Sequence, residues 1–208
     1  YMSNGQSRGQ WSGKLGFILA AAGSAIGLGN IWKFPYMTGE NGGGAFVLVY
    51  LACIVLVGLP ILFAELYIGR ETQSNTVTAF ETLHKKGTPW RIAGFMGLIS
   101  AFLILSFYSV VGGWVLDFEY KSIMNQFAGQ DDETIKSYLG ALFGSPGRLI
   151  FWHTIFMGTT IAIVVGGITK GIEKAAKILM PTLFVILIAL LFLVMTMPGF
   201  GQAFNFLF

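Results

Sequence analysis

The chain alternates between long apolar segments and short polar ones. A helix needs about 20 mainly apolar residues to cross a bilayer. Five segments approach or exceed this length, and they cover residues 15–36, 45–68, 92–118, 149–167 and 178–197. The pattern therefore predicts an all-α integral membrane protein in which residues 1–208 form a single transmembrane domain of five spans.

Two of the polar connections carry shorter helical patterns. In the connection 69–91, apolar residues recur at helical spacing from Val77 to Leu83, which predicts a short helix at the membrane surface. In the next connection, the acidic run Asp131–Glu133 precedes a similar pattern that ends at Leu142. Acidic residues stabilise the positive end of a helix, so we expect a small amphipathic helix to begin there.

Composition and charge agree with a membrane protein. Of the residues, 54% are hydrophobic and only 11% are charged, against roughly 25% charged in soluble domains. Nine Lys and Arg residues fall on the side of the N-terminus and three on the other, so we expect a cytoplasmic N-terminus. The nine are Arg8, Lys14, Arg70, Lys85, Lys86, Arg91, Lys170, Lys174 and Lys177.

The first span has a weak point at its centre, Gly23–Asn30, which holds three glycines and an asparagine. Each glycine costs about 1 kcal/mol relative to alanine in a helix interior. In hydrocarbon, an opened turn leaves backbone N–H and C=O groups unpaired at several kcal/mol each. A break here is therefore expected to face a ligand, with carbonyls directed at cations and N–H groups at an anion.

Ionisable residues inside membrane spans are functional candidates. Lys33 follows the weak point by one turn, and the alternative is that it extends to the outer interface. Glu65 lies in the inner part of the second span. It either pairs with Arg70 or accepts hydrogen bonds from backbone N–H groups that the broken helix frees.

Other spans contain a tyrosine and two prolines of interest. Ile104 and Tyr108 are four residues apart and share a helix face. The Tyr108 hydroxyl needs a partner, which is either a neighbouring helix or a ligand. Pro60 and Pro181 should kink their spans or free a carbonyl. Neither histidine has a companion at metal-ligand or catalytic spacing, so no enzyme activity is predicted.

Several motifs together resemble one family, the neurotransmitter:sodium symporters, and most closely its bacterial amino-acid branch. They are Trp11, Leu15–Ala20, the run GSAIGLGNIWKFPY from Gly23 to Tyr36, Glu40–Phe46, Glu65 with Gly69 and Arg70, Tyr108 with Trp114, and Gly171–Lys174 followed by Met180 and Pro181. The resemblance implies two inverted five-helix repeats with helix one unwound at mid-membrane. This chain matches the first repeat, so we expect it to be the N-terminal half of a larger transporter whose partner is the second repeat.

The resemblance also implies two sodium sites, each incomplete in this chain. The carbonyl of Ala25 and the side-chain oxygen of Asn30 would bind the first sodium ion. The carbonyls of Gly23 and Ile26 would bind the second. Oxygen ligands suit hard cations.

A substrate site follows from the same resemblance. The N–H of Gly29 and the hydroxyl of Tyr108 would hold a carboxylate, while Ala25 and Ile104 would shape the side-chain pocket. Family members that carry monoamines have an aspartate at the position of Gly27. The glycine leaves room for the substrate's own carboxylate, which favours an amino acid.

The remaining matched positions are assigned to gating or support. They are Arg8 and Trp11 at the cytoplasmic gate, Lys33 at the outer gate, Glu65 as a brace for the unwound segment, and Gly171 and Pro181 where helix five would loosen. Lys33 replaces the arginine of many members, so the outer gate loses a bidentate contact.

The function expected from these features is sodium-coupled symport of an amino acid across the plasma (inner) membrane by alternating access. The alternative is a non-transporting, amino-acid-binding receptor or scaffold with the same fold.

Overall fold

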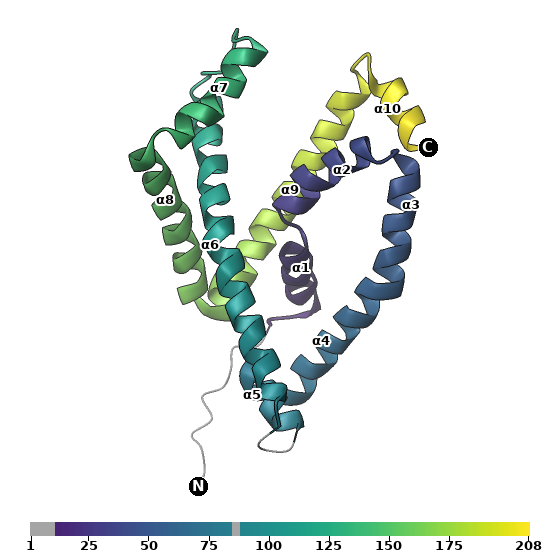
Figure 1. Cartoon of the computed structure of the whole chain (residues 1–208), viewed down its shortest axis with the longest axis vertical. Helices are drawn as coiled ribbons and strands as arrows, with labels where there is room; N and C mark the ends of the chain where they lie inside the picture. The colour runs from purple at the N-terminus through teal and green to yellow at the C-terminus, as the bar shows by residue number, and fades with distance from the viewer. Residues whose placement is uncertain (1–10, 85–87) are drawn as a thin grey trace. The chain divides into compact units, whose positions relative to one another are not determined.

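The computed structural model describes residues 11–84 and 88–208, and this part of the chain contains helices and no strands. Figure 1 labels most of the elements along the chain. In order they are α1 (Lys14–Ala25), η1 (Gly29–Lys33), α2 (Phe34–Glu40), α3 (Gly44–Cys53), η2 (Ile54–Gly58), α4 (Leu59–Thr72), α5 (Thr76–Leu83), α6 (Trp90–Ile123), α7 (Asp132–Phe143), α8 (Pro146–Val165), η3 (Ile168–Glu173), α9 (Lys174–Met195) and α10 (Phe200–Leu207). The η segments are π-helical turns.

The chain forms two compact units. The first contains the described residues up to Phe63 together with Ala162–Phe208, and the second contains the described part of Ala64–Ile161. The boundaries fall inside α4 and α8. Each unit therefore has its own set of contacts.

The membrane spans agree with the five that the apolar pattern predicts. Within the described residues, four helices are long and apolar enough to cross a membrane, and a bent pair, Lys14–Ala25 with Gly29–Glu40, provides a fifth. The four are Gly44–Thr72, Trp90–Ile123, Pro146–Val165 and Ile168–Met195. The helix that contains the last predicted span starts at Ile168, ten residues before 178, because the lysine-rich segment before Ile178 is also helical.

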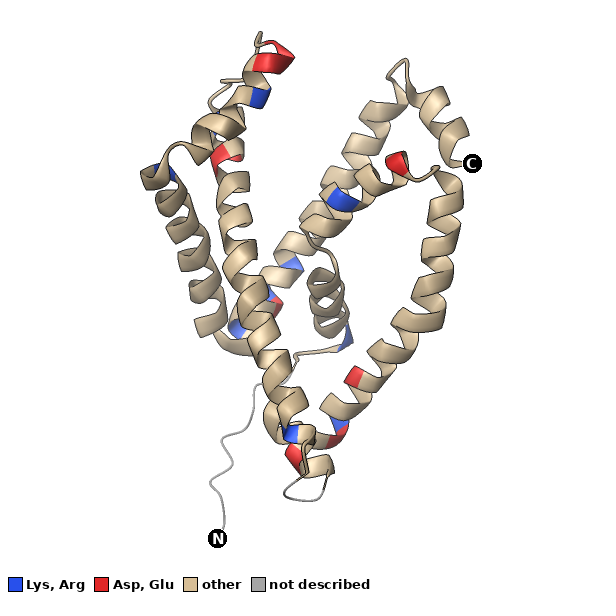
Figure 2. Ribbon diagram, in the orientation of Figure 1, with Lys and Arg blue, Asp and Glu red and all other residues tan. Residues whose placement is uncertain are grey.

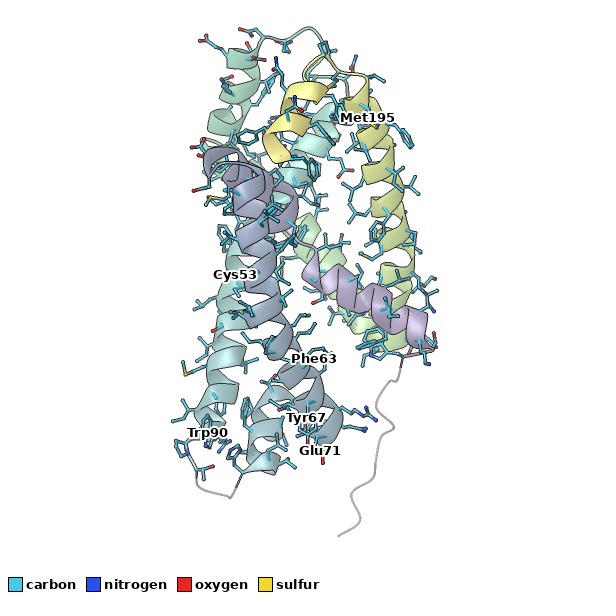
Figure 3. The ribbon with its side chains drawn as sticks, turned by 90° about the vertical axis from the view of Figure 1, so that its right-hand side faces the viewer. Cys53, Phe63, Tyr67, Glu71, Trp90 and Met195 are labelled. Carbon is cyan, nitrogen blue, oxygen red and sulfur yellow. The ribbon has the colours of Figure 1, made fainter. Side chains whose placement is uncertain are left out.

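Most apolar side chains of these spans point outward. Figure 3 follows one span from Cys53 past Phe63 and Tyr67 to Glu71, and both aromatic side chains are exposed. Figure 2 shows long stretches of helix without charge, with Lys, Arg, Asp and Glu mostly near helix ends and turns. Such surfaces are stable against lipid or other helices, where exposing them costs no hydrophobic free energy.

Two of the widened turns precede a proline by the same distance. η1 ends at Lys33, two residues before Pro35, and η2 ends at Gly58, two residues before Pro60. Proline lacks the N–H for the helical hydrogen bond, and its ring crowds the carbonyl four residues earlier. A π-turn widens the helix at that point. The predicted disturbance at Pro60 therefore takes the form of a π-turn, whereas α9 continues as a helix through Pro181.

The second unit is organised around α6. The predicted short helix is confirmed as α5, which begins after Asn75, whose side chain accepts the Thr78 N–H at 2.9 Å. This helix packs closely on α6 at Gly94. A methyl group added to Gly94 would lie 2.7 Å from the Cα of Val77.

A buried ion cluster joins the other end of α6 to α8. Asp117 is 0% exposed and accepts a hydrogen bond from Arg148 Nε at 2.7 Å, while Lys121 Nζ lies 3.2 Å from its second oxygen. The Lys121 ammonium also lies 4.5 Å from the ring centroid of Tyr138 on α7. A buried carboxylate is tolerated only with such partners, so this cluster fixes three helices to one another.

The predicted acidic helix start is confirmed in α7. The Asp131 side chain accepts the Thr134 N–H at 3.3 Å. Hydrogen bonding to Thr134 lowers the pKa of the Asp131 carboxyl, so the cap is ionised at neutral pH and favours the positive end of the helix.

We predict that the contact between α5 and α6 is intolerant of a side chain at Gly94. Gly94→Ala should lower the unfolding free energy by about 1–3 kcal/mol, because the new methyl group meets the backbone of α5. Gly97→Ala is the matched control on the same helix, since its nearest neighbour would be Thr76 Cγ2 at 3.7 Å. Thermal unfolding in detergent measures both, and equal melting temperatures would contradict the packing described.

Candidate functional site

The break predicted in the first span is present between α1 and η1. The α1 helix ends at Ala25, and Ile26 has extended backbone angles, φ −91° and ψ 114°. The π-turn η1 begins at Gly29, and the two halves of the span meet at an angle of 57°. The glycines and the asparagine therefore stop the helix where their low helix propensity predicts.

Asn30 stabilises the start of the second half. The N–H of Gly27 donates to Asn30 Oδ1 at 3.0 Å, and the N–H of Asn30 donates to the Gly27 carbonyl at 3.0 Å. The Ile31 N–H also reaches the Gly27 carbonyl, at 3.4 Å. This reciprocal pair resembles a capping box, in which a side chain three residues into the helix satisfies the N–H of the cap residue.

The two helix ends at the break differ in electrostatic sign. The last turn of α1 ends in carbonyls that have no following helical turn to bond. The Ala22 carbonyl accepts the Ile26 N–H at 3.0 Å. The beginning of η1 directs N–H groups outward, at the positive end of the helix dipole. Gly29 is exposed, with open space where a side chain would project. The break can therefore present oxygen atoms to a cation and N–H groups to an anion.

The predicted ion-binding positions all lie in this segment of the first unit. Gly23 and Ala25 belong to the last turn of α1, Ile26 is the first extended residue, and Asn30 is in η1. Gly23 also lies against α9, since a methyl group there would be 3.2 Å from Met180 Sδ. The carbonyls of the last turn and the Asn30 amide are thus within one short stretch of chain.

Three predicted residues belong to the second unit. Ile104 and Tyr108 lie one turn apart on α6, where Ile104 is exposed and Tyr108 is half-buried. Glu65 is an exposed residue of α4, and among the described ion pairs none joins it to Arg70. Their contribution to a site with Gly27 and Gly29 stays a prediction.

The predicted gate residues differ in their surroundings. Lys33 is exposed and its ammonium lies 5.4 Å from the ring centroid of Tyr36, one turn further on. Trp11 is half-buried and contacts Phe17 edge-on, with ring centroids 6.0 Å apart. Arg8 lies outside the described residues.

Gly171 lies inside η3, in a close contact with the end of α8. It is buried, and a methyl group there would overlap the Ile163 carbonyl oxygen and lie 3.0 Å from the carbonyl carbon of Gly166. The hairpin turns at Gly167, whose φ of +72° favours glycine. Gly171 therefore allows two backbones to meet, and Pro181 lies ten residues further along the same helix.

A polar cluster of Ser12, Glu173 and Lys177 was missing from the sequence-based prediction. The Lys177 ammonium lies 2.7 Å from the buried Glu173 carboxylate, to which the Ser12 N–H donates at 2.9 Å. Only the spacing of four between Glu173 and Lys177 signalled an interaction. Ser12 is 161 residues from Glu173 in sequence, so its contact depends on the fold.

Comparison with known proteins identifies the family. The model of the sodium:neurotransmitter symporter family matches residues 8–137, which include the break and its flanking motifs. The chain belongs to this family. The match also covers Glu65, Ile104 and Tyr108.

Relatives extend the similarity beyond the matched residues. The chain is 39% identical over 201 residues to the sodium-dependent transporter YhdH of Bacillus subtilis, covering 95% of this chain and 44% of the relative. It is 28% identical over 231 residues to human "Inactive sodium-dependent neutral amino acid transporter B(0)AT3", covering 98% of this chain and 36% of the relative. It is 36% identical over 116 residues to a sodium-dependent dopamine transporter of Caenorhabditis elegans, covering 56% of this chain and 18% of the relative. The chain thus spans less than half the length of these relatives.

We predict that Gly171 is needed for the hairpin between α8 and η3. Gly171→Ala should lower the unfolding free energy by about 1–3 kcal/mol, because the methyl group overlaps the backbone of Ile163. Gly158→Ala on α8 is the control, with no atom within 4 Å of the added methyl group. A melting temperature unaffected by Gly171→Ala would show that the two backbones are not in contact.

Proposed function

We propose that this chain provides the first half of a sodium-coupled amino-acid symporter that works by alternating access in the plasma membrane, with a cytoplasmic N-terminus. The observation that carries the proposal is the break at Ile26 and Gly27, at the centre of an apolar span in a member of this family. An interrupted helix at membrane depth requires partners for its backbone groups. Ions and a charged substrate provide these partners.

Sodium is bound by the oxygens around the break. The carbonyl of Ala25 and the Asn30 side-chain oxygen serve the first ion, and the carbonyls of Gly23 and Ile26 serve the second. The amide oxygen of Asn30 accepts one hydrogen bond from Gly27 and retains a second lone pair for an ion. The negative end of the α1 dipole adds to the attraction.

The substrate is an amino acid whose carboxylate faces the beginning of η1. Relatives are named for neutral amino acids and for dopamine, so the family alone leaves the substrate class open. Gly27 favours the amino acid, because it adds no negative charge beside the N–H of Gly29. Tyr108 donates its hydroxyl to the carboxylate, and Ile104 and Ala25 contact the substrate side chain.

Coupling follows from shared use of the unwound segment. Sodium binding organises the segment that the substrate needs, so each ligand raises the affinity for the other. Glu65 braces the segment by accepting backbone N–H groups, Lys33 belongs to the outer gate, and Arg8 and Trp11 belong to the cytoplasmic gate. The inside opens when α1 moves and the η3–α9 helix loosens between Gly171 and Pro181.

The test is uptake by the intact protein in vesicles. Vesicles with an inward sodium gradient should accumulate radiolabelled proteinogenic amino acids, and vesicles with a matched potassium gradient should not. Sodium-dependent binding without accumulation would instead support the receptor or scaffold. Absence of both binding and uptake across the amino acids would contradict the proposal.

Asn30→Ala should weaken sodium and amino-acid binding together. It removes an ion ligand and also leaves the Gly27 N–H without its acceptor, at a cost of about 1–3 kcal/mol. Asn41→Ala is the control, since the Asn41 amide donates to the Met37 carbonyl at 2.8 Å, outside the break. Sodium titrations monitored by amino-acid binding give both affinities, and an unchanged sodium affinity would remove Asn30 from the ion site.

Gly27→Asp should abolish amino-acid binding by placing a carboxylate beside the carboxylate of the substrate. Gly39→Asp is the charge-matched control, at an exposed position of α2 with open space around it. Equilibrium binding at saturating sodium measures the loss. Retained affinity in Gly27→Asp would refute the argument that Gly27 selects amino acids.

A further inference from the structure

The start of α1 is held against the η3–α9 helix by the Ser12–Glu173–Lys177 cluster. One carboxylate oxygen of Glu173 accepts the Ser12 N–H at 2.9 Å. The other accepts the Ser12 hydroxyl and lies 2.7 Å from Lys177 Nζ. Lys177 Nζ also donates to the Ser12 hydroxyl oxygen at 3.0 Å, which closes the triangle. Ser12 thus interacts through both its main chain and its side chain.

The Glu173 carboxylate depends on these contacts. Glu173 is 1% exposed, whereas the Lys177 side chain is 42% exposed. A carboxylate withdrawn from water is tolerated only when charged or hydrogen-bonding partners replace the water. Ser12 and Lys177 provide three such donors. Separating α1 from η3 would therefore leave the Glu173 carboxylate without the two that come from Ser12.

Glu173 also places a negative charge beside the start of α1. The N-cap of α1 is Gly13, which has no side chain to satisfy the N-terminal N–H groups. The dipole of α1 favours a negative charge at this end, and Glu173 of η3 provides it. The stability of the first turn of α1 is therefore linked to a contact with another helix.

The two helices approach closely because α1 has small residues on this side. Gly16 is buried, and a methyl group there would overlap the Glu173 carboxylate. Seven residues later Gly23 faces Met180, which is seven residues after Glu173. The contact is therefore polar at the start of α1 and apolar near the break. Separating the two helices at the polar end would remove the partners of the buried Glu173 carboxylate, which opposes the separation.

We infer that the Ser12–Glu173–Lys177 cluster is a latch that sets how readily α1 leaves the η3–α9 helix. The inference rests on the proposed function, in which this separation opens the cytoplasmic side. Glu173 and Ser12 act as positioning residues, since they touch neither the ions nor the substrate. The latch favours the arrangement in which α1 holds its carbonyls beside Gly27 and Asn30, so opening it lowers the apparent affinity for sodium.

The latch is tested on the intact protein by hydrogen–deuterium exchange of residues 13–20, in potassium and then with added sodium. Glu173→Gln should speed exchange there about ten-fold in potassium, as expected for loss of a hydrogen-bonded charge. It should also raise the sodium concentration needed for half-maximal protection. Glu71→Gln removes a carboxylate from an exposed position of α4 and should change neither.

Ser12 provides a milder pair of variants that tests the same contact. Ser12→Ala removes the hydroxyl and should speed exchange, while Ser12→Thr keeps the hydroxyl and should behave as the original protein. If Glu173→Gln unfolds the protein, exchange rises in every helix, and the Ser12 pair then decides. Equal exchange in Ser12→Ala and Ser12→Thr would overturn the latch.

The uptake assay separates this inference from the proposed function. Uptake by the original protein, with exchange at residues 13–20 unaffected by Glu173→Gln, would overturn the latch and leave symport intact. Faster exchange in the variants, without sodium-dependent uptake or binding by the original protein, would confirm the contact but overturn its role in transport. Faster exchange together with a raised sodium requirement supports both.

Discussion

A peptide group in hydrocarbon must have a hydrogen-bonding partner, and the first span meets this constraint in an unusual way. Its helix stops at Ala25 and starts again at Gly29. Asn30 and Gly27 satisfy each other across the gap through two hydrogen bonds of 3.0 Å. The rest of the break presents carbonyls on one side and N–H groups on the other. These groups are dipoles, so the break offers polar ligands at mid-span without burying a charged side chain.

The half-helix α1 connects this break to the N-terminal end of the span. The last turn of α1 carries the carbonyls at the break. Ser12, just before the first turn, contacts Glu173. A short helix moves largely as a rigid body, so groups bound at its two ends bias the same motion. Its small residues, Gly16 and Gly23, let α1 pack closely on the η3–α9 helix beside the buried Glu173 carboxylate.

Irregular helical geometry recurs where the chain chemistry requires it. Pro35 and Pro60 each follow a widened π-turn by two residues, where the helix accommodates a residue that lacks an N–H donor. At η3 the surroundings are different, because Gly171 meets the backbone of the preceding helix. The same local shape thus occurs just before a proline in two places and at a close backbone contact in the third.

The sequence alone determined the number of spans, the break at Gly23–Asn30, the helices α5 and α7, and the family. These features depend on local quantities: apolar length, glycine propensity, capping residues and contiguous motifs. The helix that contains the last predicted span begins earlier, at Ile168, because helical structure continues through charged residues that hydropathy excludes. Only the tertiary structure decided that Gly171 is a backbone contact and that Glu173 meets Ser12. Those contacts depend on which groups folding brings together. Hydrogen bonds form at about 3 Å, and the separation of two residues along the chain does not give their distance in space.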